Sequence, residues 1–206
     1  MRSKTINIIP AKPGVGSSTL AVALATRYGT PQEPVLLVAH SLYQYHDIIS
    51  LAGGSHSDEE STHFENFILT YTMAPRIADL VEHTTRTIRL NSASVIYDKS
   101  GYLDNCQDDL FIMCIDNHYR SLYWAVQHTH SMNMYVCLTY ADSVLQHKDI
   151  SNVVGGPVFQ VDYSVDTARR IDAGLFTSRR DNQQYNDIFD RLTSIERITN
   201  ERSIQL

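Results

Sequence analysis

Short apolar runs rich in β-branched residues recur along the chain, and polar or turn residues bound each of them. Runs of this kind are typical of strands buried on both faces of a sheet. They predict strands at Thr5–Ile9, Val35–Val38, Leu110–Ile115, Met134–Tyr140 and Val158–Val161. Helices are predicted at Ser18–Tyr28, Met73–His83, Tyr119–Gln127, Val165–Ala173 and Tyr185–Ile198. Because strands and helices alternate, the pattern predicts an α/β fold with a mostly parallel sheet and helices on both faces.

Two stretches fit this alternation less well. Ser50–His63 contains Gly53-Gly54 and a run of acidic residues, which predict an exposed loop. Thr87–Asp104 predicts one or two irregular strands with turns near Gly101. The sequence contains no repeat and no clear linker, and its 206 residues suffice for one sizeable core. We therefore expect a single compact domain spanning residues 1–206.

Composition narrows the compartment and the available chemistry. With 43% hydrophobic and 19% charged residues, the chain is typical of a soluble globular protein. It has no apolar run long enough to cross a bilayer and no signal-type segment at its start, so we expect a cytoplasmic protein. Three cysteines without metal-like spacing predict buried free thiols, at Cys106, Cys114 and Cys137. His128 and His130 lack the further ligands that a closed metal site needs.

The charge pattern bears on possible partners. A net charge of −6 argues against gripping nucleic acid over the whole surface. The carboxyl-terminal part mixes arginines with aspartates and glutamates, which favours a solvated helix face over a DNA-contacting patch. Its last helix carries an apolar stripe, which favours packing on the sheet over insertion into a membrane surface.

The most specific motif follows the first predicted strand. Gly14 and Gly16 form a glycine-rich turn between that strand and a helix, where backbone N–H groups and the helix dipole can hold phosphates. In the common form of this loop, a lysine follows the last glycine and a Ser or Thr then binds Mg²⁺. Here Ser17 occupies the lysine position, and Ser18 keeps the metal-binding position.

The loop resembles the deviant Walker A box of the ParA/MinD family of partitioning and positioning ATPases. That box, K-G-G-x-G-K-[ST]-[ST], corresponds here to K-P-G-V-G-S-S-T. The resemblance implies a three-layer P-loop NTPase fold that binds ATP or ADP with Mg²⁺. It assigns nucleotide contacts to Lys12, Pro13, Gly14, Val15, Gly16, Ser17, Ser18 and Thr19. Lys12 falls on the family's signature lysine, which reaches the partner's phosphates across a nucleotide-bridged dimer. Pro13 and Ser17 depart from the box, and they predict weakened nucleotide binding.

Other positions match the family's pattern in order. The strand ending at Asp116 is similar to its Walker B segment, in which one carboxylate joins the Mg²⁺ shell; capping of the next helix is the alternative role. Ala39 and Ser41 stand where the family carries switch aspartates that help hydrolysis. The stretch from Gln160 to Ser164, including Asp162, would flank the base or ribose. Between Ala141 and Pro157 we expect no room for the additional helix and asparagine-bearing strand of larger relatives.

The resemblance implies a nucleotide-binding switch for partitioning plasmid, phage or chromosomal DNA, or for positioning a cellular assembly, with weak or absent ATP hydrolysis. Its partners would be a second copy of the chain, a DNA-binding adaptor or other regulatory protein, and non-specific DNA. Catalysis, if present, would depend on Lys12 and Asp116. Two alternatives stay open: a nucleotide-free scaffold that localises a pilus or secretion machine, and a slow ATPase in which Lys12 replaces the missing loop lysine.

Overall fold

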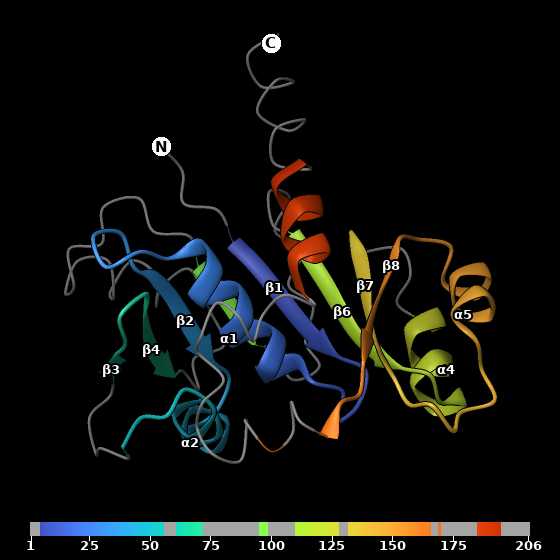
Figure 1. Cartoon of the computed structure of the whole chain (residues 1–206), viewed down its shortest axis with the longest axis horizontal. Helices are drawn as coiled ribbons and strands as arrows, with labels where there is room; N and C mark the ends of the chain where they lie inside the picture. Colours follow the sequence, from blue (N-terminus) through green and yellow to red (C-terminus); the bar gives the residue numbers. More distant parts are fainter. Residues whose placement is uncertain are drawn as a thin grey trace, which may run out of the picture.

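The computed structural model describes residues 5–55, 61–71, 95–98, 110–127, 132–165, 169 and 185–194. Its elements follow one another along the chain as strands with intervening helices (Figure 1). In order they are β1 (Thr5–Pro10), α1 (Ser17–Tyr28), β2 (Val35–Ala39), α2 (Leu42–Leu51), β3 (Ser61–His63), β4 (Phe67–Tyr71), β5 (Val95–Asp98), β6 (Leu110–Asp116), α4 (Tyr119–Gln127), β7 (Met134–Thr139), α5 (His147–Val154) and β8 (Val158–Asp162). A further helix covers residues 186–194.

The strands form one eight-stranded sheet in the order β3-β4-β2-β5-β1-β6-β7-β8. Every neighbouring pair is parallel except β3 and β4, which are antiparallel. Parallel strands end at the same edge, so the segments that follow β1, β6 and β7 meet there. The chain after β1 runs in one direction across the sheet and later returns on the other side of β1, and open α/β sheets bind ligands at such a reversal.

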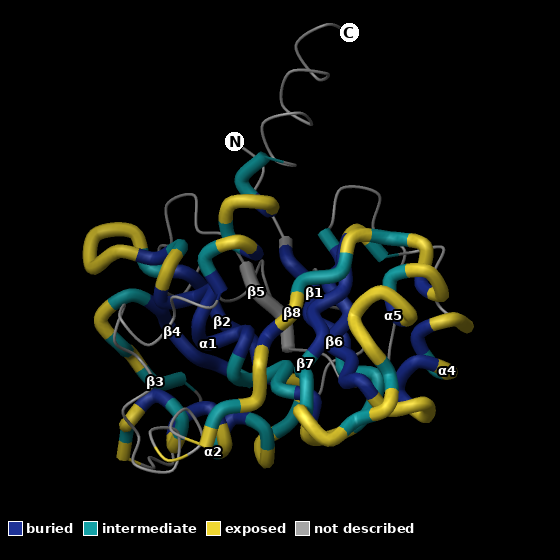
Figure 2. The backbone as a smooth tube through the Cα atoms, turned by 45° about the vertical axis from the view of Figure 1, so that its right-hand side comes forward, coloured by how far each residue is buried: buried dark blue, intermediate teal, exposed yellow. Residues whose placement is uncertain are grey.

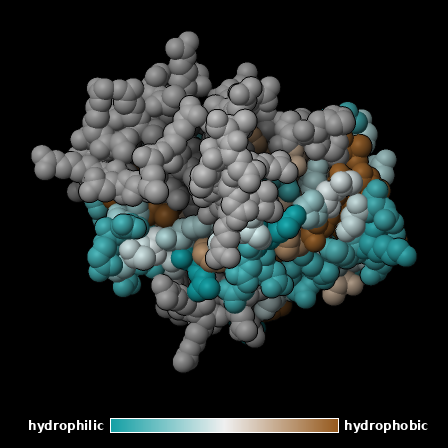
Figure 3. Space-filling model, turned by 90° about the horizontal axis from the view of Figure 1, so that it is seen from above, coloured by the Kyte–Doolittle hydropathy of each residue, from teal (hydrophilic) through white to brown (hydrophobic). Residues whose placement is uncertain are grey.

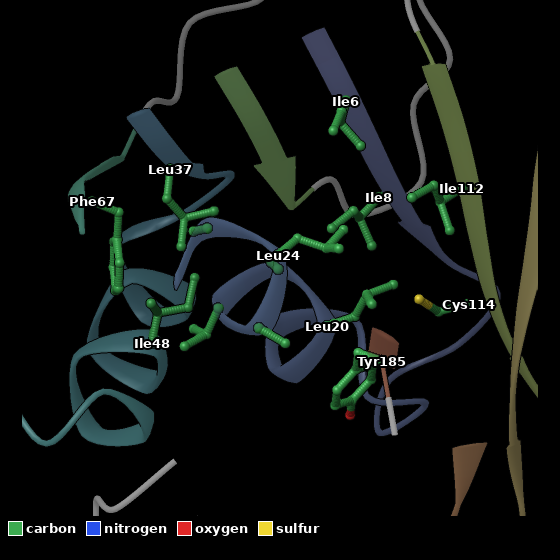
Figure 4. Close-up of a cluster of buried hydrophobic side chains, with 14 of the residues drawn as sticks. Ile6, Ile8, Leu20, Leu24, Leu37, Ile48, Phe67, Ile112, Cys114 and Tyr185 are labelled. Atoms are coloured by element: carbon green, nitrogen blue, oxygen red, sulfur yellow. The ribbon is translucent and has the colours of Figure 1, made fainter. Parts of the chain in front are cut away.

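Helices cover both faces of the sheet and create two cores. On one face, α1, α2 and the helix over 186–194 pack on the sheet through residues such as Leu20, Ile48 and Ile188. Figure 4 shows Leu20, Leu24 and Ile48 pointing toward the side chains of β1, β4 and β6. On the other face, α4 and α5 pack through Leu122 and Ile150. This arrangement confirms the α/β class with a mostly parallel sheet between two helical layers.

The double coverage explains why the central strands are mostly apolar. In β6, Ile112 and Cys114 belong to the core beneath α1, whereas Met113 and Ile115 belong to the core beneath α4. Because both sets of side chains are removed from water, no polar alternation is needed. In Figure 2 most of β1, β2 and β6 is buried, and the exposed residues lie mainly on loops and outer helix turns. Cys114 and Cys137 are buried and form no disulfide, as predicted. Cys106 lies outside the described residues.

The carboxyl end of α1 is tied closely to the segment before β4. Gly29 N–H closes the helix on the carbonyl of Ala25 at 3.0 Å. A Cβ on Gly29 would overlap the carbonyl oxygen of Asn66, so no larger residue fits there. That carbonyl accepts a hydrogen bond from Val35 N–H at 3.1 Å, and the Asn66 side chain donates to the carbonyl of Thr26 at 3.2 Å. Asn66 therefore joins the end of α1 to the start of β2.

Several predicted elements are confirmed and others need correction. All five predicted strands form, and α4 covers the predicted Tyr119–Gln127. The predicted loop at Ser50–His63 is wrong at both ends, because Ser50 lies in α2 and residues 61–63 form β3. Helix α2 and strand β4 were not predicted. The stretch between Ala141 and Pro157, where we expected no room for an additional helix and strand, contains the helix α5. Strand β5 lies within Thr87–Asp104, as expected.

Other sequence predictions fall where nothing is described. The helix predicted at Met73–His83, most of Val165–Ala173, and the histidines at 128 and 130 lie outside the described residues. The helix predicted at Tyr185–Ile198 is present over residues 186–194. Within the described ranges no helix has the length and apolar character that crossing a bilayer requires. On the described part of the face in Figure 3, hydrophilic side chains predominate, with small hydrophobic areas between them.

Candidate functional site

The segment between β1 and α1 is a tight loop at the carboxyl edge of the sheet. Ala11 N–H donates to the carbonyl of Cys114 at 2.8 Å, so the chain stays beside β6 as it leaves β1. Gly14 and Gly16 then adopt left-handed conformations with φ of 82° and 81°, which residues with a Cβ rarely adopt. Val15, between them, is buried and anchors the loop in the core. Loop shape is thus set by backbone conformation at two glycines.

The loop leaves open the backbone groups that could hold an anion. Helix α1 begins at Ser17, and no side chain caps its N-terminus. A Cβ built on Gly14 or Gly16 would meet nothing within 4 Å, so the space beside the loop is free. The N–H groups of a helix's first turn lack partners within the helix and carry partial positive charge. A helix start without a side-chain cap fits a phosphate group.

A cleft of about 560 Å³ adjoins the loop. Its size lies in the range of small-molecule sites. One wall is the loop and the start of α1, and the other is the second half of α2. Its lining residues are Gly14, Gly16, Ser17, Ser18, Thr19, Asp47, Ser50 and Leu51, and we call this space the loop cleft. Among these lining residues there is no lysine or arginine, and Asp47 brings a carboxylate that the sequence analysis had not considered.

Lys12 points away from this lining toward Asp116, at the end of β6. Its Nζ lies 2.6 Å from Asp116 Oδ2. The aspartate side chain is 2% exposed and that of Lys12 is 31% exposed, so the ion pair lies at the boundary between core and solvent. His118 Nδ1 lies 3.2 Å from the same Oδ2. Asp116 and Lys12, predicted to serve one site from two loops, are therefore in direct contact.

Backbone and hydroxyl groups fix the position of Asp116. Its N–H donates to Ser121 Oγ at 3.0 Å, and its Oδ1 accepts from His118 N–H at 3.3 Å. The carboxylate thus holds the turn that precedes α4, a structural role close to the predicted capping alternative. The same carboxylate also balances the positive charge of Lys12. These contacts agree with the capping alternative, and the metal role of Asp116 stays a prediction.

Asn117 connects the loops that follow β6 and β7. Its side chain is buried, donates from Nδ2 to the carbonyl of Tyr140 at 2.9 Å, and accepts from Tyr140 N–H at 3.0 Å. The hydroxyl of Ser143 donates to the carbonyl of Asn117. An asparagine that satisfies both backbone groups of one residue acts as a strand partner would. The sequence analysis missed this role, although an asparagine directly after a buried strand signals a loop anchor.

A row of aromatic rings extends from Asp116 to the edge of the sheet. The His118 and Tyr140 ring centroids lie 5.3 Å apart, and Tyr140 stacks on Tyr163 at 5.1 Å. Tyr163 is half exposed. Burial raises the pKa of Tyr140; the negative charge of Asp116 also raises it, whereas Lys12 lowers it. We call Asp116, Asn117, His118, Tyr140, Ser143 and Tyr163 the polar edge.

The remaining predicted residues lie apart from the loop cleft. The side chain of Gln160 donates to Asp162 Oδ1 at 2.7 Å, and both residues are exposed on β8. Neither lines the loop cleft. Ala39, in the position of a switch aspartate, is buried at the end of β2. Ser41 caps α2, because its Oγ accepts from Gln44 N–H at 3.2 Å. Pro13 is exposed beside the loop.

The donor set suits a hard cation more than a transition metal. In the described ranges no three His, Cys, Asp or Glu side chains cluster as metal ligands would. Ser18 offers a hydroxyl oxygen on the loop cleft, and Asp116 offers a carboxylate that already accepts a positive charge. Oxygen donors of these types, completed by water and phosphate oxygens, are what Mg²⁺ prefers. The residues therefore fit Mg²⁺ bound together with a phosphate ligand.

A glycine loop at the reversal point of a parallel sheet, followed by a helix and flanked by a carboxylate on the next strand, defines the P-loop class of α/β fold. No protein-family model and no curated protein sequence matches the chain. Several solved structures match the chain. The chain has the fold of the ParA/MinD group of P-loop ATPases.

Three of these structures show how far the likeness extends. A MinC:MinD cell division complex from Aquifex aeolicus matches at 12% identity and a TM-score of 0.67 over 93% of this chain and 96% of the other. A ParA family ATPase from Chlorobium tepidum matches at 18% identity and a TM-score of 0.60, over 85% of this chain and 90% of the other. The third structure is a protein from Borrelia burgdorferi that is assigned to plasmid partition and is bound to AMPPNP. It matches at 16% identity and a TM-score of 0.60, over 92% of this chain and 99% of the other. At these identities the likeness establishes the fold.

Proposed function

We propose that the chain is a nucleotide-dependent switch that binds ATP or ADP with Mg²⁺ in the loop cleft. The observation that carries this proposal is the uncapped start of α1 behind two left-handed glycines, facing a cleft of about 560 Å³. Backbone N–H groups would hold the phosphates, with Ser18 and Asp116 contributing to the metal shell. The AMPPNP in the Borrelia structure supports the choice of an adenine nucleotide.

The base would lie toward the polar edge. Tyr140 and Tyr163 present stacked rings two and three strands away from β1, and Tyr163 keeps an exposed surface. Adjacent strands lie about 4.8 Å apart, so these rings stand roughly 10 to 15 Å from the loop. Aromatic rings bind bases by stacking without selecting among them. In this proposal the aromatic rings contact the base by stacking. The backbone around Gln160 and Asp162 would then border the base.

Hydrolysis would be slow or absent. Phosphoryl transfer depends on positive charge around the phosphates and on positioning of the attacking water. The residues lining the loop cleft include no cation, Lys12 is engaged by Asp116, and Ala39 replaces a carboxylate. Loss of one preorganised donor typically costs on the order of 10² to 10³ in rate. The bound nucleotide would thus act mainly as a conformational signal.

In the cell we propose a cytoplasmic role in partitioning DNA or in positioning a cellular assembly. The ParA, MinD and plasmid partition proteins of similar fold support this class of role. The chain would form a homodimer when nucleotide is bound and would respond to a DNA-binding adaptor or another regulatory protein. Non-specific DNA is a further partner to test, by retention of the chain on duplex DNA with and without ATP.

Calorimetry with ATP, ADP and Mg²⁺ tests nucleotide binding directly. We expect micromolar to millimolar binding without appreciable phosphate release, and ATP-dependent dimers by light scattering. No heat and no thermal shift at millimolar nucleotide would contradict the proposal. That result would instead favour a nucleotide-free scaffold, which the carboxylate of Asp47 on the cleft already favours because it repels phosphates. Phosphate release that disappears in Lys12→Ala would favour a slow ATPase.

A further inference from the structure

The Lys12–Asp116 ion pair joins the two charged groups on which a nucleotide switch of this fold would depend. Lys12 is the only cationic residue in the loop between Ala11 and Leu20. Asp116 is the carboxylate at the end of the strand beside the loop. Their atoms lie 2.6 Å apart within one chain. While this contact persists, the ammonium cannot reach a partner subunit and the carboxylate cannot reach a metal.

The surroundings of Asp116 make these uses exclusive. Oδ2 contacts Lys12 Nζ and His118 Nδ1, and Oδ1 accepts from His118 N–H. With the side chain 2% exposed, these partners leave no open face to a hydrated ion. A divalent cation and an ammonium would also repel each other strongly at one oxygen. One of the present partners must therefore leave before a metal can approach.

Lys12 is the partner whose positive charge a metal ion would replace, and its side chain is free to move away. It has a flexible stem, its side chain is 31% exposed, and its ammonium can be hydrated when released. The His118 amide, by contrast, is part of the turn that leads into α4. We propose that Lys12 and a divalent cation compete for Asp116, so that metal loading releases the lysine. The proposal depends on the proposed function only for what the released lysine then does.

Competition at one carboxylate couples two events. If metal binding releases Lys12, then any interaction that holds Lys12 elsewhere strengthens metal binding. Metal binding in turn strengthens that interaction by the same factor. A partner subunit's phosphates would be such an interaction. Dimerisation and metal loading would then support each other, although their groups lie on different loops.

Titration with Mn²⁺ alone, without nucleotide, tests the competition. Because Lys12→Ala and Lys12→Gln remove the competing charge, we expect both to bind Mn²⁺ more tightly than the native chain. The gain is about tenfold if the pair is worth about 1.4 kcal/mol. Lys148→Ala, at an exposed lysine of α5, is the matched control and should leave the affinity unchanged. Lys12→Gln keeps a hydrogen-bond donor beside Asp116, in case the alanine variant does not fold. Equal or weaker affinity in Lys12→Gln, or no Mn²⁺ binding to any form, would overturn the proposal.

Chemical labelling of amines tests the release itself. Acetylation of Lys12, measured by mass spectrometry relative to Lys148, should rise several-fold when Mn²⁺ is added to the native chain. In the Asp116→Asn variant, acetylation of Lys12 should be high without Mn²⁺ and should not change when Mn²⁺ is added. Labelling of Lys12 that does not respond to Mn²⁺ in the native chain would overturn the proposal. Both assays omit nucleotide, so a failure to bind ATP would reject the proposed function and leave this competition to be judged by its own result.

Discussion

The loop cleft and the polar edge lie next to each other but are built in opposite ways. The loop cleft offers the start of a helix that no side chain caps, hydroxyls and open space, with no basic side chain among its lining residues. The polar edge is a dense set of contacts in which Asp116, Asn117 and Tyr140 each already have a partner, Lys12 being that of Asp116. The contrast shows that the space suited to a phosphate group lies in the loop cleft, whereas the positive charge that could attract the phosphate lies beside Asp116.

The largest expected effect concerns the shape of the loop cleft. Gly16→Val should lower ATP affinity by on the order of 10²-fold, because φ of 81° is strained for a β-branched residue and the backbone donors would move. Calorimetry measures the affinity. Gly155→Val is the matched control, since Gly155 has φ of 67° and open space around it but ends α5. If both variants bind ATP like the native chain, the loop is not the binding element.

The next effect concerns the contacts of the polar edge. Asn117→Ala should lower the free energy of unfolding by about 2 to 3 kcal/mol, because it leaves the Tyr140 N–H without its partner and removes one of the two hydrogen bonds to the Tyr140 carbonyl. Urea denaturation measures this. Asn66→Ala, which removes one hydrogen bond near the end of α1, should cost about 1 kcal/mol. Equal costs would mean that the polar edge is no more tightly organised than the opposite side of the sheet.

A third prediction separates the two regions by ligand. Tyr163→Ala should weaken ATP binding by roughly tenfold, because base stacking on an aromatic ring is worth about 1 to 3 kcal/mol. Tripolyphosphate, which has no base, should bind the variant as it binds the native chain. Competition calorimetry compares the two ligands. Unchanged ATP affinity would remove Tyr163 from the binding site while leaving the loop cleft intact.

The last effect is absent near neutral pH and appears only in alkaline solution. Burial raises the pKa of the Cys137 thiol to about 12, from an ordinary value of 9.0, and the charge of Asp116 adds to the rise. Between these values the folded chain keeps a proton that the unfolded chain loses, so stability should fall as pH rises from 9 toward 12. The slope contributed by this thiol is at most about 1.4 kcal/mol per pH unit. Cys137→Ala should flatten the decline in urea denaturation; an identical pH profile would contradict it.

Much of the fold could be predicted because strands buried on both faces leave a plain apolar signature. The run ending at Asp116 and the helix at Tyr119–Gln127 are examples. Helix α2 carries signals that were available, namely a Ser41 cap followed by apolar residues such as Tyr45 and Ile49 at helical spacing. Strand β4 is likewise a short apolar run.

The site was harder to predict because tertiary structure decides where side chains point. The glycine loop could be located from its motif, as could the strand that delivers Asp116. Sequence spacing could not show that Lys12 turns toward Asp116 within its own chain, nor that Asp47 reaches the cleft from a helix that was not predicted. The aromatic row depends on three loops that meet only when β6, β7 and β8 pair.

The contact between Gly29 and Asn66 has a mechanical consequence. The helix that begins at the glycine loop is fixed at its far end, where there is no room for even one additional carbon atom. This contact would resist sliding of the helix along its axis if the loop closed on a ligand. Any adjustment would then be a small rotation about that fixed end, which would move the first turn sideways, toward α2 or away from it.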